Sequence, residues 1–114
     1  MQMKFYCDLF ISEDFKMKKE ELVRRLKDED FRRNMYLITL AQGEQNNLEF
    51  YSSLLLKQHI YDDVPVFVVG IASGYTDALY MTEDIVNAVY ADTRDTDIRG
   101  YILMKQKEFE EGKG

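Results

Sequence analysis

The chain has 114 residues, of which 46% are hydrophobic and 13% aromatic, and this composition fits one folded domain rather than an intrinsically disordered chain. Its formal charge of −6 repels phosphate backbones, so we expect no nucleic-acid partner. The single cysteine excludes an internal disulfide, and no apolar run is long enough for a signal peptide or a membrane span, so we expect a cytoplasmic protein with no membrane partner.

The first predicted elements are a strand and a helix. Apolar residues alternate with other side chains over 3–11, which predicts a strand. Ser12, Glu13 and Asp14 carry short oxygen side chains that cap free backbone N–H groups, so we expect them to start a helix over about 15–28. The side chains that we expect this helix to bury are Leu22, Val23 and Leu26.

The middle of the chain is predicted to form two strands with a helix between them. The β-formers of residues 35–41 predict a strand. Over 45–61 the apolar residues recur at spacings of three and four, which favours a helix, although the run LEFYSSLLL within it also fits a strand. The nearly continuous apolar run 64–72 is typical of a strand that is covered on both faces.

The C-terminal third is predicted to add a helix, a strand and a tail. We expect a helix over about 76–91 and a strand over 98–104. A single domain would then span 1–104, and residues 105–114 would form a flexible charged tail. The side chains that we expect the helix to bury are Ala78, Leu79, Ile85, Val86, Val89 and Tyr90.

The predicted order of elements is β-α-β-α-β-α-β, which is typical of an α/β fold. We expect a three-layer sandwich with a mostly parallel four-stranded sheet, in which the 64–72 strand lies in the middle. The first strand carries Lys4 and Asp8 on one face, and charged residues there favour a face that is only partly covered. An α+β two-layer sandwich is therefore the alternative.

The best candidate for a binding site is the turn after the 64–72 strand, because ligands of open α/β sheets lie beyond the carboxyl ends of the strands. Free N–H groups and the dipole of a helix start favour an anion such as a phosphate, and Gly74 would let the backbone approach it closely. The segment is neither a P-loop nor a GxGxxG motif, and a tight turn with Thr76 or Asp77 as the helix cap explains it without a ligand. The candidate ligand-binding residues are Ser73, Gly74, Tyr75, Thr76 and Asp77.

Three acidic residues near predicted helix starts, Glu13, Asp14 and Glu44, offer the oxygen ligands that divalent cations prefer. Their spacing resembles no known calcium or magnesium loop. Acidic side chains at helix starts also stabilise the helix dipole without any metal. We therefore expect neither a metal nor a cofactor.

Three further residues with reactive side chains have simpler structural interpretations. Asp8 would be a candidate base if it were buried, but we expect it to face solvent and to pair with Lys4. Cys7 has apolar neighbours and is expected in the core, and His59, the only histidine, is expected on the surface. No catalytic constellation emerges, so we expect a protein that is not an enzyme. A hydrolase or transferase with Asp8 or Glu13 as its base is the weakest alternative.

The chain contains eight tyrosines and seven phenylalanines, more than a small core requires, and tyrosine is enriched at protein interfaces. Tyr80 with Met81, or Tyr6 with Phe10, would form a self-association patch; scattered amphipathic surface is the alternative. The leading hypothesis is a non-catalytic interaction module that forms a homodimer. The alternative is the binding of a small anionic or phosphate-bearing ligand at residues 73–77.

The segments YLITLAQGEQNNLEFYSSLLL and VVGIASGYTDAL, in that order, resemble small uncharacterised α/β proteins of Gram-positive bacteria, some of which are associated with mobile elements. The resemblance covers residues 3–92. It implies a bacterial cytosolic protein. It implies no activity, no cofactor and no catalytic residue.

Overall fold

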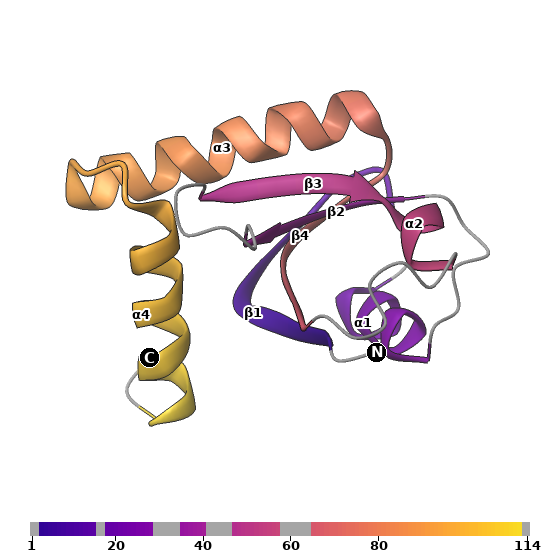
Figure 1. The fold of residues 1–114 in the computed structure, drawn as a ribbon, viewed down its shortest axis with the longest axis horizontal. Helices are drawn as coiled ribbons and strands as arrows, with labels where there is room; N and C mark the ends of the chain where they lie inside the picture. The colour runs from indigo at the N-terminus through magenta and orange to yellow at the C-terminus, as the bar shows by residue number, and fades with distance from the viewer. Residues whose placement is uncertain (1–2, 16–17, 29–34, 41–46, 58–64, 113–114) are drawn as a thin grey trace.

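The computed structural model describes residues 3–15, 18–28, 35–40, 47–57 and 65–112. Within these residues the chain has a mixed α/β fold, in which helices pack against a four-stranded sheet (Figure 1). The elements in chain order are β1 (Met3–Ile11), α1 (Lys19–Lys27), β2 (Tyr36–Leu40), β3 (Leu48–Ser52), α2 (Ser53–Lys57), β4 (Val66–Ala72), α3 (Tyr75–Thr93) and α4 (Ile98–Glu110).

The sheet has the strand order β1-β4-β2-β3. β4 lies between β1 and β2, so the interior position that we expected for the most apolar strand is confirmed. β4 is parallel to β1 but antiparallel to β2, and β2 is antiparallel to β3. The expectation of a mostly parallel sheet is therefore wrong. β3 follows β2 in the chain and also lies next to it in the sheet. Only antiparallel strands can be joined by so short a connection.

Residues 48–52 form β3, where the sequence predicted part of a helix over 45–61. Leu48 and Phe50 enter one hydrophobic cluster and Tyr51 enters the other, which is the two-residue period of a strand. All five residues of β3 pair with the five residues of β2. Among the described residues of the predicted range, helix forms in the short α2 that follows. The cross-strand pairing with β2 therefore decides between two structures that the local spacing allows.

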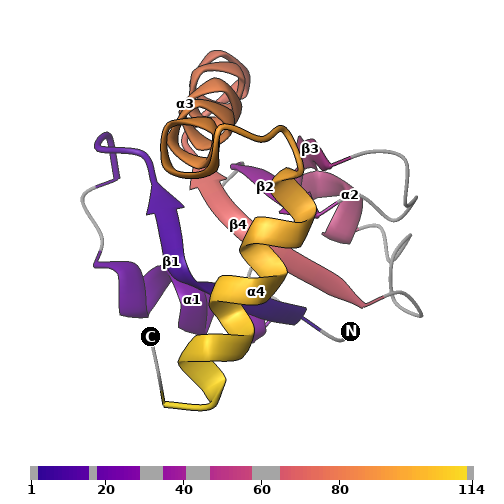
Figure 2. The same ribbon diagram turned by 90° about the vertical axis from the view of Figure 1, so that its left-hand side faces the viewer.

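One face of the sheet is covered by α3 and α4, and Figure 2 shows α4 running across this face in front of β1 and β4. Ile38 of β2 and Val69 of β4 pack in one cluster with Ile85 of α3 and Ile102 of α4. None of these four side chains is more than 1% exposed. This cluster holds the two C-terminal helices to the sheet.

The strand predicted over 98–104 is wrong, because residues 98–110 form α4. The side chain of Asp97 accepts a hydrogen bond from the backbone N–H of Gly100 at 3.0 Å and caps the first turn. The segment 105–110, expected to belong to a flexible tail, is the second half of this helix. The buried residues lie four apart, which is a helical spacing, and they are Ile98, Ile102 and Gln106.

The other face of the sheet packs against α1. Leu22 and Leu26 of α1 are at most 1% exposed, and they lie in one cluster with Leu37 of β2 and Val68 of β4. α1 begins at Lys19, later than predicted, and no side chain caps its first turn. Apolar burial therefore carries most of the attachment of this short helix.

Helix α3 buries one side chain per turn against the sheet. Leu79 and Tyr90, which we expected to be buried, are each 46% exposed. Although α3 is 19 residues long, neither it nor another helix among the described residues has the apolar run that crossing a membrane requires. The buried side chains of α3 are Ala78, Met81, Ile85 and Val89.

Candidate functional site

The parallel pairing of β1 with β4 brings two serines together at the carboxyl ends of these strands. Ser12 follows β1, and Ser73 follows β4. The backbone N–H of Ser73 donates to Ser12 Oγ at 3.1 Å, and the backbone N–H of Ser12 donates to the carbonyl of Ile71 at 3.0 Å. These bonds hold the end of β1 against the turn that starts α3.

The acidic residues at this end of the sheet do not act as the helix caps that we expected. The hydroxyl of Ser73 donates to the carboxylate of Asp77 and lies 3.3 Å from the carboxylate of Asp14. The N-cap of α3 is Gly74, and no side chain caps this helix. Asp14 and Asp77 instead both contact the hydroxyl of Ser73. The start of α3 is therefore linked through Ser73 to the segment that follows β1.

The five predicted binding residues do not form one group. Ser73 and Asp77 contact each other, whereas Thr76 is exposed and Tyr75 is 57% exposed. A Cβ atom built on Gly74 would have no neighbour within 4 Å, so the turn does not need a glycine for close packing. Of the five, Ser73 therefore bonds to the segment that follows β1, and Asp77 contacts Ser73.

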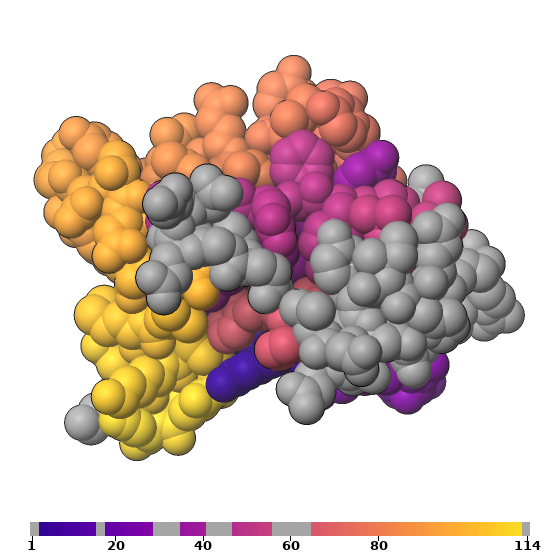
Figure 3. All heavy atoms as spheres, in the orientation of Figure 1, coloured from indigo at the N-terminus to yellow at the C-terminus, as the bar shows by residue number. Residues whose placement is uncertain are grey.

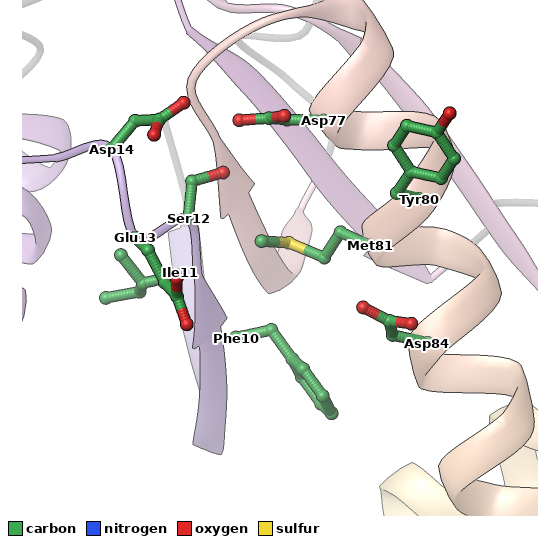
Figure 4. A pocket seen from close by; sticks show the side chains of 9 residues that line it. All are labelled: Phe10, Ile11, Ser12, Glu13, Asp14, Asp77, Tyr80, Met81 and Asp84. Carbon is green, nitrogen blue, oxygen red and sulfur yellow. The ribbon is translucent and has the colours of Figure 1, made fainter.

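A pocket of about 330 Å³ lies between the end of β1 and the first turns of α3 (Figure 4). Figure 4 shows Asp14, from the segment after β1, and Asp77, from α3, pointing toward each other at one end of the pocket, with Asp84 further along α3. Apolar side chains complete its wall. The lining residues are Phe10, Ile11, Ser12, Glu13, Asp14, Asp77, Tyr80, Met81 and Asp84.

Among the described residues, four carboxylates line this pocket, and no lysine, arginine or histidine does. Their negative potential opposes the attraction of the α3 N-terminus for an anion. Among the described residues, no group of three or more His, Cys, Asp or Glu is arranged to hold a metal ion. Glu44, the third member of the predicted metal set, lies outside the described residues. The negative charge of the four carboxylates therefore disfavours a phosphate in this pocket.

Three residues that the sequence did not predict for this site also line the pocket, namely Tyr80, Met81 and Asp84. They follow Asp77 at helical spacings, so all four residues share one side of α3. This spacing can be read from the sequence. The sequence does not reveal that this side of α3 faces Phe10, because that contact depends on β1 lying parallel to β4.

A second candidate surface lies on a different side of α3, where three aromatic rings meet. The ring centre of Tyr75 lies 5.8 Å from that of Tyr36 on β2 and 5.7 Å from that of Phe50 on β3. Tyr36 and Phe50 also contact each other, at 6.3 Å. The rings of β2 and β3 therefore support one side of Tyr75 and leave the other side open to solvent.

Apolar side chains continue from Tyr75 along α3. Leu79 and Tyr90 are each 46% exposed, and Val86 is partly buried. Figure 3 shows α3 at the surface of the molecule, with β3 directly below it. We refer to four residues of this helix as the apolar stripe: Tyr75, Leu79, Val86 and Tyr90.

The apolar stripe is not the patch that the sequence predicted. Tyr80 is 64% exposed, but its expected partner Met81 is only 8% exposed. Tyr6, the centre of the other expected patch, is only 5% exposed and packs in the core with Phe10 against it. Neither predicted pair therefore offers two exposed side chains.

A chain of polar contacts joins β1 to α4. The backbone N–H of Cys7 donates to Oε1 of Gln106 at 2.7 Å, and Nε2 of Gln106 donates to Glu110 at 3.0 Å. Lys4 pairs with Glu110 at 2.6 Å, so the expected pair of Lys4 with Asp8 does not form. Asp8 is exposed, as we expected.

Three groups near these contacts have raised pKa values, so their surroundings favour the neutral form. Burial, and after it the carboxylate of Asp8, raises the pKa of the Cys7 thiol and also that of the Tyr6 phenol. The hydrogen bond that Tyr101 donates to Asp92 at 2.8 Å raises the pKa of Tyr101. Cys7 is partly exposed rather than fully buried, but its raised pKa makes it a weak nucleophile.

Comparison of the chain with models of protein families, with curated proteins and with solved structures found no match. The resemblance to proteins of Gram-positive bacteria therefore stays a prediction. His59 lies outside the described residues, so its expected surface position also stays a prediction. The two candidate sites are defined by their own geometry alone.

Proposed function

We propose that the protein is a non-catalytic interaction module that forms a homodimer through the apolar stripe of α3. The observation that carries this proposal is the exposure of three large side chains on one side of the helix, 57% for Tyr75 and 46% each for Leu79 and Tyr90. Exposed apolar patches mark interaction sites, and tyrosine is enriched in them.

The length of the stripe supports a second copy of the chain as its partner. The stripe runs from Tyr75 to Tyr90, a length of about 22 Å at the helical rise per residue. Two such stripes packed about a two-fold axis bury the same residues on both copies, which is the usual geometry of a homodimer. Tyr36 and Phe50 widen the contact beyond a single helix.

The charges of α3 are compatible with this pairing. Asp77 and Asp84 lie away from the stripe, where they line the acidic pocket. Glu83 is the acidic residue next to the stripe, and each copy carries a formal charge of −6, so the two copies repel each other weakly. Salt screens this repulsion. We therefore expect the dimer to tighten as the ionic strength rises.

Analytical ultracentrifugation over a range of protein concentrations tests this proposal. We expect the wild-type chain to dimerise and Leu79→Glu to remain monomeric at the same concentrations, because the substitution places a charge in the centre of the interface. Ala91→Glu adds the same charge at an exposed position on another side of α3 and should dimerise normally. A monomeric wild type, or a Leu79→Glu variant that dimerises like the control, would overturn the proposal.

The pocket beside Ser73 and Asp77 supports a second function, the binding of a small molecule. Ligand pockets are typically about 300–1,000 Å³ in volume, with apolar walls and a few polar groups, and this pocket measures about 330 Å³. Its carboxylates, with the rings of Phe10 and Tyr80, are groups that attract organic cations. Its charge therefore favours an amine over the anionic ligand that the sequence predicted.

An NMR titration with spermidine and, separately, with inorganic phosphate compares the two ligand classes. We expect saturable shifts at Phe10 and Tyr80 with spermidine, and weaker binding by Asp84→Asn than by Glu83→Gln, which removes the same charge outside the pocket. Shifts with phosphate alone would restore the anionic ligand of the sequence prediction. The absence of shifts with both would remove this second function.

A further inference from the structure

A groove of about 500 Å³ lies between β1 and α1. Its floor is apolar and is formed by Phe5 and Leu9 from β1 and by Val23 from α1. Leu9 is 9% exposed, whereas Phe5 and Val23 are partly buried. The groove shares no residue with the apolar stripe or with the acidic pocket. It is therefore a separate feature of the surface.

Counted over the described residues, the rim of the groove carries a net positive charge, although the chain as a whole is acidic. Nζ of Lys27 lies 5.7 Å from the centre of the Phe5 ring, so a cation stands directly over the apolar floor. The acidic partner of Arg24 among the described residues is Glu21, at a long 4.0 Å, and the Arg24 side chain is 66% exposed. The charged residues of the rim are Lys19, Arg24 and Lys27, against Glu20 and Asp28.

We propose that this groove binds a medium-chain carboxylate, with its hydrocarbon chain on Phe5 and Leu9 and its carboxylate between Arg24 and Lys27. An apolar floor with a few charged groups at the rim is the usual construction of a ligand pocket. The hydrocarbon chain gains free energy from each methylene that it buries. The cations at the rim attract a negative head group and repel a positive one.

Addition of a peptide strand to the edge of β1 explains the groove less well. A peptide bound in this way relies on hydrogen bonds from the backbone of the edge strand. The backbone N–H of Cys7 already donates to Gln106 of α4 at 2.7 Å. The register of β1 also shifts between Phe5 and Phe10, which interrupts a regular edge. A flexible chain does not depend on either feature.

An NMR titration of the full chain with decanoate, kept below its micelle-forming concentration, tests the proposal. We expect saturable shifts at the amides of Phe5, Leu9 and Val23. The double variant Arg24→Glu with Lys27→Glu should bind at least about tenfold more weakly, because the charges that meet the head group are reversed. Decyltrimethylammonium, with the same chain and a positive head group, should give no saturable shift at these amides.

The matched control is Arg94→Glu with Lys107→Glu, which makes the same change in net charge at exposed positions on other elements. It should bind decanoate within about twofold of the wild type, because these charges lie outside the groove. Circular dichroism checks that both double variants are folded, and the single variant Lys27→Glu replaces the first if that variant is not.

Three outcomes would overturn the proposal. The first is a wild type that shows no saturable shift with decanoate. The second is equal binding of decanoate and decyltrimethylammonium, or equal binding by the groove variant and its control. The third is a response to vesicles of anionic phospholipid without one to monomeric decanoate, which would indicate a membrane surface instead.

Discussion

The two faces of the sheet are joined to their helices in different ways. On the face of α3 and α4, apolar burial is accompanied by directional hydrogen bonds, since Asp97 caps α4, Asn47 bonds the segment before it and Gln106 bonds β1. On the other face, α1 has nine residues and no side-chain cap, and its attachment depends on Leu22 and Leu26. The first face is therefore fixed in register by polar contacts, whereas the second depends on a few buried side chains.

The two sides of β1 also lead to pockets of opposite charge. The pocket where β1 ends beside α3 is lined by carboxylates, and the groove between β1 and α1 has a cationic rim. One strand thus separates a site that suits a cation from a site that suits an amphipathic anion. The groove lies on the face where the described residues make fewer polar contacts, so substitutions in α1 test both stability and binding.

The largest expected effect belongs to Leu22→Ala. Leu22 is fully buried on the α1 face, and truncation of such a leucine costs about 2–5 kcal/mol because it leaves a cavity. Urea denaturation measures the change in the free energy of unfolding. Val23→Ala, in the same helix but only partly buried, is the control and should cost much less. Equal costs for the two variants would mean that α1 does not depend on its buried leucines.

Gln106→Ala tests the polar contacts of the other face. The variant leaves the backbone N–H of Cys7 without its acceptor in a partly buried place, and such a loss costs about 1–3 kcal/mol. Lys107→Ala changes the exposed neighbour and should be nearly neutral. If urea denaturation gave the two variants the same stability, the bond between β1 and α4 would contribute nothing to this face.

The sequence predicts the elements whose apolar spacing allows a single structure. The alternation of β1 and the continuous apolar run of β4 identify these strands, and the helical spacing of α3 identifies the helix that follows. The segments that become β3 and α4 allow two structures. Leu48 and Phe50 fit the spacing of a strand as well as that of a helix, and pairing with β2 selects the strand.

For α4, the β-branched and aromatic residues of IRGYILM favour a strand. The residues that favour a helix instead lie just outside that run. Asp97 caps the helix before it, and Gln106 extends the buried helical side beyond it. A glutamine is an unusual core residue, so its burial cannot be recognised until its acceptor role for β1 is known.

The candidate sites were predicted in part. Ser73 and Asp77 lie at the end of the sheet as the general rule for open α/β sheets indicates. Asp14 and Phe10 join them only because β1 lies parallel to β4, which is a long-range pairing that local spacing does not contain. The exposure of Leu79 likewise depends on how α3 is rotated over the sheet, and one turn of spacing does not fix that rotation.

Thr39→Val should stabilise the protein by about 1 kcal/mol, because it replaces a buried hydroxyl that lacks a partner with a methyl group. Thr39 is 1% exposed, and its Oγ1 has no hydrogen-bond partner among the described residues. Thr82→Val is the matched control on α3, where the hydroxyl donates to the carbonyl of Ala78 at 2.8 Å. A gain in the free energy of unfolding for the control alone would contradict this account.

The smallest effect concerns the ion pair that closes the contacts between β1 and α4. The hydrogen bond from Lys4, and after it the one from Gln106, lowers the pKa of Glu110. Glu110 in the unfolded chain therefore binds a proton more readily than Glu110 in the folded chain. The ion pair with Lys4 thus stabilises the fold above the ordinary glutamate pKa, and this stabilisation is lost as the pH falls through the lowered pKa. Lys4→Met should therefore reduce the loss of stability on acidification, whereas Lys107→Met should not.

The Lys4 and Glu110 side chains are 55% and 45% exposed, so the effect should be small and should fade in high salt. Urea denaturation at a series of pH values measures it, and the same acid slope for Lys4→Met and the wild type would mean that this pair does not hold α4 to β1.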